Sequence, residues 1–402
     1  MRNGKWIVAA LVAAGWTALI FGAGWLARSQ AQWPAHVAAA AAATHLQAPG
    51  YALLDEAWGL VRNHFVGVVP SDTVRNYGAV RGMLGTLNDR WSMFVEPQPR
   101  AIERDQLRGQ FGGIGVNISV DEANRIVLSP MRDSPAAKAG VLEGDVLVAV
   151  DGVPLPAGAQ FEDIAAKVRG EIGSVVRITV KRGDQALDFA ITRAAIEVPS
   201  VDWRVITGTA PSDVPVGYIA IRQFTERTGG EVKRAITELR QSGSQAYLID
   251  LRHNTGGMLS AAVEVASQFL DAGNVLIERK RDQADVAYPV IAGGLATKEP
   301  LAVLVNGDTA SASEIVAGAW QDYRRAKLVG DKTYGKGSVQ LLFDLSDGSS
   351  VHVTTAKWMT PKARAIDGVG LVPDILVARA EGEIEKGVDS QLDRALQLLR
   401  NR

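Results

Sequence analysis

The segment NGDTASASEIVAGAW, residues 306–320, carries three hydroxyl side chains at alternate positions: Thr309, Ser311 and Ser313. A hydroxyl can attack a carbonyl carbon once a neighbouring base takes its proton. The same letters have a simpler interpretation, because Ser311 and Glu314 fit the capping box S-x-x-E, which starts a helix before an apolar run. The segment therefore predicts a helix N-terminus, and a nucleophile only if a base lies nearby.

A candidate base follows in GDKTYGKGSVQ, residues 330–340, where Lys336 stands between two glycines. A lysine that packs against glycine backbone loses hydration, and full burial lowers a lysine pKa by up to ~3–5 units. A fall from ~10.4 to ~7.5 costs about 4 kcal/mol and yields a neutral amine that can take a serine proton. The spacing approaches a nucleotide-binding P-loop, but Gly337 stands where that loop needs serine or threonine, so we expect no nucleotide.

Other common catalytic side chains are scarce. The chain has no cysteine, which excludes a thiol nucleophile, a cysteine-ligated zinc and disulfide bonds. Its five histidines lack the H-E-x-x-H and H-x-x-E-H spacings of zinc peptidases, so we expect neither a metal nor another cofactor. Asp250 and Asp322 are interpreted as members of ion pairs or caps, and His352 as a strand residue. The formal net charge of −1 gives no indication of a nucleic-acid partner.

The N-terminus predicts a membrane anchor. Trp6–Leu26 is a run of 21 residues without a charge, and a helix of ~20 apolar residues spans a bilayer. Arg2 and Lys5 precede this run, so the positive-inside rule leaves the N-terminus in the cytoplasm and exports the body of the chain. The alternative is a cleaved signal peptide, although the small residues at 38–44 lie well beyond the apolar run. Both interpretations place the body on the periplasmic or extracellular side.

The remaining chain divides by its patterns into three parts, after the stub and anchor at 1–30. Residues 31–103 are an alanine-rich tether and a region with helical apolar spacing. Residues 104–195 alternate short strands with Gly, Asp and Pro turns, which is typical of a small β-rich module. Residues 196–402 alternate strands and helices and end in an amphipathic helix, so we predict an α/β domain with a partly parallel sheet.

The β-rich module opens on FGGIGV and continues with SPAAKAGVLEGDVLVAVDG. A glycine-rich loop can point several backbone N–H groups at an anion, and the strand after it can accept an extended peptide. Together the two runs resemble a PDZ domain, whose loop captures a terminal carboxylate. The resemblance implies that this chain binds a free C-terminus with the loop residues Gly113, Ile114, Gly115 and Val116.

Over residues 51–375 the chain resembles the C-terminal processing proteases, which are tail-specific, PDZ-containing serine proteases. The matching runs are FGGIGV, SPAAKAGVLEGD, DLRHNTGG, GVGLVPDI and the long run from Asn306 to Gln340. The resemblance implies a protease core of the crotonase and ClpP-like α/β type with an inserted PDZ domain. It also implies that Ser311 is the nucleophile, that Lys336 is the general base, and that Gln340 orients the lysine.

The oxyanion hole is implied by the same resemblance. It consists of backbone N–H groups from the glycine turn and the helix N-terminus, where the helix dipole favours negative charge: Gly256, Gly257 and Ala312. The chain departs from the common family pattern DLRNNPGG at His253 and Thr255, and Thr309 replaces a serine that is not the nucleophile. His253 adds an imidazole near the expected site, so a serine–histidine variant stays open.

The resemblance implies an exported, membrane-tethered serine endopeptidase that recognises apolar C-terminal tails of proteins or peptides. In this family, tail binding is thought to align the catalytic groups, and Arg169 in the VRG turn is a candidate contact between the PDZ domain and the core. The alternative is a catalytically idle, membrane-tethered PDZ adaptor, which would need none of the three catalytic side chains. The natural substrate, a homo-oligomeric state and the need for an activating partner stay open.

Overall fold

The computed structural model describes residues 51–156, 158–159, 161–208, 214–379, 382–383 and 387–400. The chain separates into two units, Met1–Ser71 and Asp72–Arg402. Within the first unit the structure describes one helix, α2 (Tyr51–His64). The predicted anchor at residues 6–26 lies outside the described residues. No helix in the described part of the chain is long and apolar enough to span a membrane.

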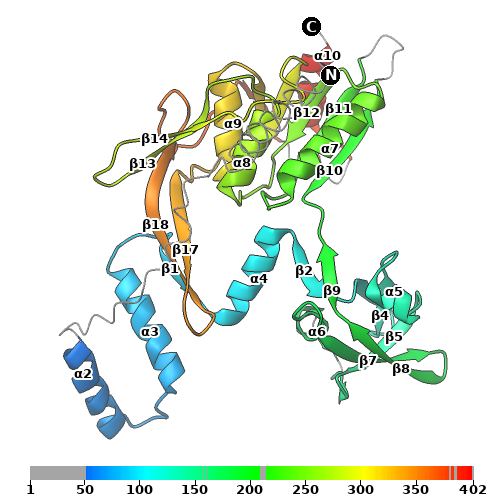
Figure 1. The fold of residues 1–402 in the computed structure, drawn as a ribbon, viewed down its shortest axis with the longest axis vertical. Helices are drawn as coiled ribbons and strands as arrows, with labels where there is room; N and C mark the ends of the chain where they lie inside the picture. Colours follow the sequence, from blue (N-terminus) through cyan, green and yellow to red (C-terminus); the bar gives the residue numbers. More distant parts are fainter. Residues whose placement is uncertain are drawn as a thin grey trace, which may run out of the picture. The chain divides into compact units, whose positions relative to one another are not determined.

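The core of the second unit is a six-stranded sheet whose strands are parallel except for the first (Figure 1). Its middle strands are continuous apolar runs, as expected for strands that helices cover on both faces. In spatial order the strands are β10 (Val201–Ile206), β11 (Val216–Ile221), β12 (Ala246–Asp250), β15 (Leu301–Val305), β16 (Lys327–Gly330) and β19 (Ile375–Leu376).

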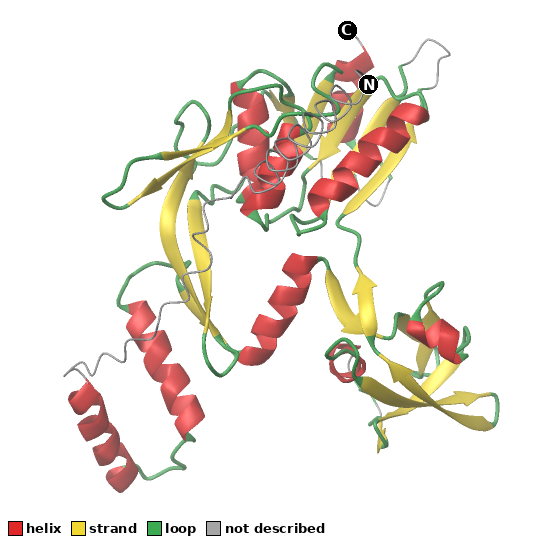
Figure 2. Cartoon of the chain, in the orientation of Figure 1, coloured by secondary structure: helices red, strands yellow, loops and turns green. Residues whose placement is uncertain are grey.

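Helices pack on both faces of this sheet (Figure 2). Three of them share one apolar cluster with the sheet: α7 (Thr228–Gln241), α8 (Leu259–Ser267) and α9 (Ala312–Asp322). The opposite face packs against α10 (Ser390–Arg400) through Ala395, Leu396 and Leu399. The predicted α/β core with a closing amphipathic helix is therefore confirmed.

A second, antiparallel sheet extends from the core. Its longest pairing joins β17 and β18, which are consecutive in the chain and connected by a turn at Ser346 and Asp347. Two further helices of this unit lie before the β-rich module: α3 (Asp72–Gly85) and α4 (Pro97–Arg108). The strands of the sheet are β1 (Met93–Val95), β13 (Asn274–Lys280), β14 (Val286–Pro289), β17 (Ser338–Asp344) and β18 (Ser350–Met359).

The β-rich module has its own antiparallel sheet and its own apolar core. The paired strands β2 (Gln110–Gly113) and β9 (Ala194–Glu197) carry the chain into and out of it. Two short helices accompany the sheet: α5 (Pro135–Ala139) and α6 (Phe161–Val168). The strands are β3 (Val116–Val120), β4 (Ile126–Pro130), β5 (Asp145–Val150), β6 (Val153–Pro154), β7 (Val175–Arg182) and β8 (Gln185–Thr192).

The parallel strands decide where chemistry can occur. β12, β15 and β16 are neighbours, so the loops that follow their carboxyl ends emerge at one edge of the sheet. These loops are residues 251–258, 306–311 and 331–337. They contain the glycine turn, the hydroxyl-rich segment and Lys336, which are far apart in the sequence.

Candidate active site

The glycine turn lies directly against Ser311. A Cβ atom added at Gly256 would be 2.8 Å from the Cβ of Ser311 and 3.0 Å from the backbone nitrogen of Ala312. A Cβ atom at Gly257 would be 2.1 Å from the carbonyl oxygen of Phe224. Both glycines have positive φ values, 110° and 138°, which disfavour other residues. The sequence therefore needs glycine at both positions to bring this turn to the start of α9.

The three hydroxyls of the opening segment differ in what they contact. Thr309 and Ser313 are fully buried. The Thr309 hydroxyl donates to the carbonyl of Leu251 at 2.9 Å, and that of Ser313 donates to the carbonyl of Asn254 at 2.9 Å. Ser311 is half-buried, and it forms the predicted capping box with Glu314; among the described residues, its hydroxyl donates to no acceptor. Two hydroxyls thus fix the loop by donating to backbone carbonyls, whereas that of Ser311 donates to no described residue.

Ser311 also has an unusual backbone conformation, with φ 55° and ψ −119°. A residue other than glycine with positive φ is uncommon, and such strain is concentrated at functional sites. The residue precedes α9, so the Ala312 N–H and the dipole of the helix N-terminus lie beside it. This position suits a nucleophile whose attack creates a negative charge.

Glu314 connects the backbone of Ser311 to that of Lys336. Its carboxylate is fully buried and accepts from the Ser311 N–H at 2.9 Å and the Lys336 N–H at 2.8 Å, both through Oε2. Oε1 accepts from the Thr333 hydroxyl at 2.5 Å and the Gly335 N–H at 2.8 Å. Burial raises the pKa of Glu314, and these hydrogen bonds oppose that rise. The predicted cap residue therefore also positions the loop of the candidate base.

The glycine turn and the start of α9 offer backbone donors unequally. The Gly256 N–H donates to Asn254 Oδ1 at 2.9 Å, so it is occupied. Within the described residues, the N–H groups of Gly257 and Ala312 have no hydrogen-bond partner. Asn254 is fully buried and holds the turn in place, because its Nδ2 donates to the Ile221 carbonyl at 2.8 Å.

Lys336 is half-buried, and its ammonium nitrogen lies 4.5 Å from the centre of the Trp91 ring. Burial lowers the pKa of Lys336, and the positive charge of Arg90 lowers it further. The direction agrees with the prediction of a partly desolvated lysine. Among the described residues, its Nζ forms no hydrogen bond or ion pair, including none with the Ser311 hydroxyl.

Gln340 lies on β17 with its amide directed at neighbouring hydroxyls. Its Nε2 donates to Ser338 Oγ at 2.9 Å and to Thr354 Oγ1 at 3.2 Å. No hydrogen bond joins it to Lys336 in this conformation of the described chain. Its predicted role in orienting the lysine stays a prediction.

The other polar candidates have partners of their own. His253 is exposed and contacts Asp308, with 2.7 Å between Nδ1 and Oδ2. Asp250 forms a buried ion pair with Arg252 at 2.6 Å, as expected from the sequence. Asp322 is paired with Arg364 at 2.5 Å. His352 is buried on β18 and contacts Glu103 at 3.2 Å.

A separate groove lies in the β-rich module, and the four loop residues named above line it: Gly113, Ile114, Gly115 and Val116. Its volume is about 250 Å³, and its other lining residues include Ile118, Met131 and Val168. Strand β3 is an edge strand, so one side of its backbone is open to an added strand. Gly115 has φ 69°, and a Cβ there would lie 2.6 Å from the Cβ of Ser134. The groove can therefore accept an extended, apolar peptide.

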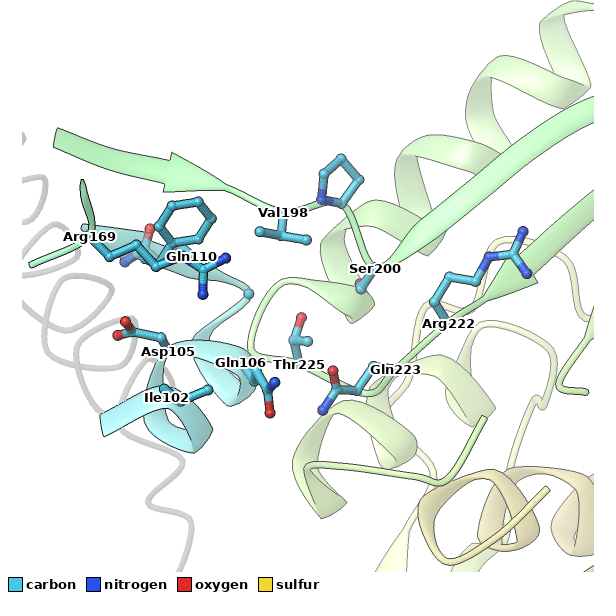
Figure 3. A pocket seen from close by; sticks show the side chains of 13 residues that line it. Ile102, Asp105, Gln106, Gln110, Arg169, Val198, Ser200, Arg222, Gln223 and Thr225 are labelled. Atoms are coloured by element: carbon cyan, nitrogen blue, oxygen red, sulfur yellow. The ribbon is translucent and has the colours of Figure 1, made fainter. Parts of the chain in front are cut away.

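Arg169 lies where the β-rich module meets the core. Its guanidinium is 4.2 Å from the centre of the Phe111 ring. It lines a cavity of about 330 Å³, together with Asp105 of α4 and with Gln223 and Thr225 of the core (Figure 3). Arg169 thus shares a cavity with core residues, and its role as the contact between the two parts stays a prediction.

The sequence did not predict the roles of Asn254, Arg90 and Trp91, or that the Glu314 carboxylate also binds the loop of Lys336. The capping box identified Glu314 but gave no sign that its carboxylate reaches residues 333–336. Arg90 and Trp91 lie more than 240 residues before Lys336 in the chain, and no motif connects them to it. The run DLRHNTGG contained the signal for Asn254, because a buried asparagine before a glycine turn often bonds the turn.

Comparison with known proteins agrees with this architecture. Residues 215–377 match the model of peptidase family S41, and residues 126–182 match that of the PDZ domain. A carboxy-terminal-processing protease of Bartonella bacilliformis is 37% identical over 339 residues, which cover 83% of this chain and 76% of the relative. A carboxyl-terminal-processing protease of Synechocystis sp. is 34% identical over 349 residues, with 85% and 81% covered.

Among solved structures, the photosystem II D1 C-terminal processing protease is 30% identical, with 85% of this chain and 90% of that chain covered and a TM-score of 0.48. The fold and the matches define a serine-type peptidase that carries a PDZ domain. More specifically, the chain belongs to the carboxy-terminal-processing proteases of peptidase family S41.

Proposed function

We propose that Ser311 and Lys336 form the catalytic dyad of this peptidase. The observation that carries the proposal is the contrast among the three hydroxyls: those of Thr309 and Ser313 donate to backbone carbonyls, whereas that of Ser311, beside the glycine turn and at the N-terminus of α9, donates to no described residue. The carboxylate of Glu314 supports it, because one oxygen accepts from the backbone N–H groups of both dyad residues.

The proposed reaction uses these groups once Lys336 has moved to Ser311. Ser311 Oγ attacks the scissile carbonyl carbon while Lys336 Nζ accepts the hydroxyl proton, as the base does in other serine peptidases. The N–H groups of Gly257 and Ala312 donate to the oxyanion of the tetrahedral intermediate. Lys336 then returns the proton to the departing amine, and a water molecule deprotonated by the same amine hydrolyses the acyl-enzyme.

Binding of a C-terminal tail in the PDZ groove brings Lys336 within reach of Ser311. Lys336 lies over Trp91, and Gln340 bonds Ser338 and Thr354, so both must reorient before the lysine can reach Ser311. In the active arrangement Gln340 bonds Lys336 and fixes its amine. Arg169, at the junction of the PDZ domain and the core, is the residue through which tail binding is communicated.

The substrates are proteins or peptides with exposed, apolar C-termini, because apolar side chains line the groove beside the loop residues. The apolar run Trp6–Leu26 anchors the chain in the cell membrane. Arg2 and Lys5 keep the N-terminus cytoplasmic, so the catalytic body faces the periplasmic or extracellular side. The enzyme thus acts on exported proteins.

A cleavage assay tests the proposal. The full chain in detergent is incubated with an unfolded protein that ends in an apolar tail, and fragments are followed by mass spectrometry. We expect cleavage by the parent, no cleavage by Ser311→Ala or Lys336→Ala, and normal cleavage by Lys332→Ala, an exposed lysine of the same loop. If Lys336→Ala cleaves and His253→Ala does not, the assigned base is wrong. If the parent binds the tail without cutting it, the chain is an adaptor.

A further inference from the structure

The loop Asp89–Ser92 is fixed to the sheet that carries Gln340. It leads from α3 into β1, and Met93 of β1 pairs with His352 of β18. Ser92 Oγ accepts from the backbone N–H of Thr354 at 3.1 Å and donates to Asp89 Oδ2 at 2.6 Å. The Asp89 carboxylate also accepts from the Trp91 N–H at 3.3 Å. These contacts hold the loop against β18.

The indole of Trp91 contacts two cations. Lys336 Nζ is 4.5 Å from the ring centre, and the guanidinium carbon of Arg90 is 4.4 Å from it. The ring of Tyr334 packs edge-on against Trp91, with 6.2 Å between centres, and lies 5.8 Å from the Arg90 guanidinium. Because Tyr334 belongs to the same loop as Lys336, two side chains of this loop pack against the Trp91 ring.

The two neighbours of Lys336 act on its amine in opposite directions. The face of an indole attracts a cation, so Trp91 stabilises the ammonium form and holds it in place. The positive charge of Arg90 repels an ammonium group and therefore favours the neutral amine. No hydrogen bond from Lys336 Nζ competes with these two effects among the described residues.

We propose that Arg90 and Trp91 are positioning residues of opposite effect, which hold the Lys336 amine over the indole and govern its protonation. The proposal rests on the proposed role of Lys336 as the general base. The indole keeps the protonated lysine away from Ser311. Deprotonation abolishes the attraction to the ring, and the neutral amine is then free to move to the serine. With Arg90 nearby, Lys336 loses its proton, and so leaves the ring, at a lower pH than it would without this positive charge.

The other charged and titratable groups around Lys336 have partners of their own. Glu314 binds the backbone N–H of Lys336 and is held by four donors. Asp367 accepts from the Gly337 N–H at 3.3 Å and pairs with Lys357 at 3.0 Å. Besides Arg90, the elements packed around Lys336 carry five charged or titratable groups: Asp89, Glu314, Tyr334, Lys357 and Asp367. Of these, Arg90 is the group whose charge acts on the pKa of Lys336.

The test is the pH profile of kcat/KM for a tail-bearing peptide, measured on the full chain, because its acid limb reports the base of the free enzyme. In Arg90→Gln the limb moves to higher pH, and activity at the acid end falls about two- to tenfold relative to the plateau. In Trp91→Leu, which keeps apolar volume but loses the ring, the limb moves to lower pH, with acid-end activity about two- to fivefold higher relative to the plateau.

Conservative variants separate these effects from a loss of structure. Arg90→Lys keeps the positive charge, so it moves the acid limb less than Arg90→Gln does. Trp91→Phe keeps an aromatic ring, so it moves the limb less than Trp91→Leu does. Arg125→Gln removes one exposed charge from the PDZ domain and leaves the limb in place. Limbs that stay fixed in both Arg90→Gln and Trp91→Leu, or that move in the same direction, overturn the proposal. Because Arg90 is exposed, its variant folds even if Trp91→Leu does not.

The failure of this inference is distinct from that of the proposed function. If Lys336→Ala keeps activity, Lys336 is not the base, and the proposed function fails first. If Lys336→Ala is inactive while the Arg90 and Trp91 variants leave the limb fixed, the dyad stands and this inference alone is wrong.

Discussion

Replacing Glu314 with glutamine is the most informative perturbation of the site after removal of the dyad itself. The carboxylate accepts four hydrogen bonds in a fully buried position, from Ser311, Thr333, Gly335 and Lys336. A glutamine has the same shape, but only its oxygen accepts, and its NH₂ group would face donors. In one orientation the N–H groups of Ser311 and Lys336 lose their acceptor; in the other, that of Gly335 does.

The magnitude follows from the donors left unpaired. A buried donor without an acceptor costs about 1–3 kcal/mol, so we expect Glu314→Gln to lower the free energy of unfolding by about 2–5 kcal/mol. At roughly 2–4 °C per kcal/mol, the Tm falls by about 5–15 °C. The same change shifts the backbone of the dyad, and a displacement of about 1 Å can reduce catalysis about 100-fold.

The assay combines thermal unfolding with the kcat/KM of the folded variant, measured well below its Tm. Glu226→Gln is the matched control, because Glu226 is exposed, and we expect a change within about 0.5 kcal/mol. If Glu314→Gln retains both the parent Tm and the parent kcat/KM, the carboxylate does not hold the two loops, and the argument from its contacts is refuted.

Three further predictions concern the turn, the PDZ domain and the base. Gly257→Ala abolishes cleavage, because its Cβ would lie 2.1 Å from the carbonyl oxygen of Phe224. The control Gly230→Ala, in α7 with open space around it, leaves the cleavage rate unchanged and raises the free energy of unfolding by up to about 1 kcal/mol. Asp145→Asn destabilises the PDZ domain by about 1–3 kcal/mol at neutral pH in thermal unfolding. The hydrogen bond from Arg182 lowers the pKa of Asp145. The ionised carboxylate therefore stabilises the domain at pH values above the usual aspartate pKa, and this stabilisation is lost as pH falls through the lowered pKa. A loss of unfolding free energy in Asp145→Asn that is the same at pH 7 and in strong acid would contradict this. Because burial lowers the pKa of the proposed base, kcat/KM rises with pH through a limb below the usual lysine pKa of ~10.4, and a limb at or above that value would contradict burial.

Much of the fold could be predicted because its patterns are local. The apolar run LAVLV became β15, and the helix expected after it became α9. The alternation of strands and helices indicated a partly parallel sheet, which places the loops after β12, β15 and β16 at one edge. The resemblance then implied which residues in those loops are catalytic.

The finer geometry could not be predicted, because it depends on contacts between distant segments. Periodicity cannot show that Trp91 covers Lys336, since the indole comes from a loop before β1. A glycine pair cannot show which N–H is already bonded, and Asn254 decides that for Gly256. Gln340 bonds Ser338 and Thr354, and this choice of partners depends on how β17 pairs with β18.

Covalent labelling of the nucleophile tests the central claim most directly. A fluorophosphonate reacts with an activated serine by forming an Oγ–P bond with loss of fluoride, and the labelled peptide is located by mass spectrometry after digestion of the full chain. We expect a single label on Ser311 that disappears in Lys336→Ala and persists in Lys332→Ala. A label on Thr309 or Ser313, or one that survives Lys336→Ala but is lost in His253→Ala, would contradict it.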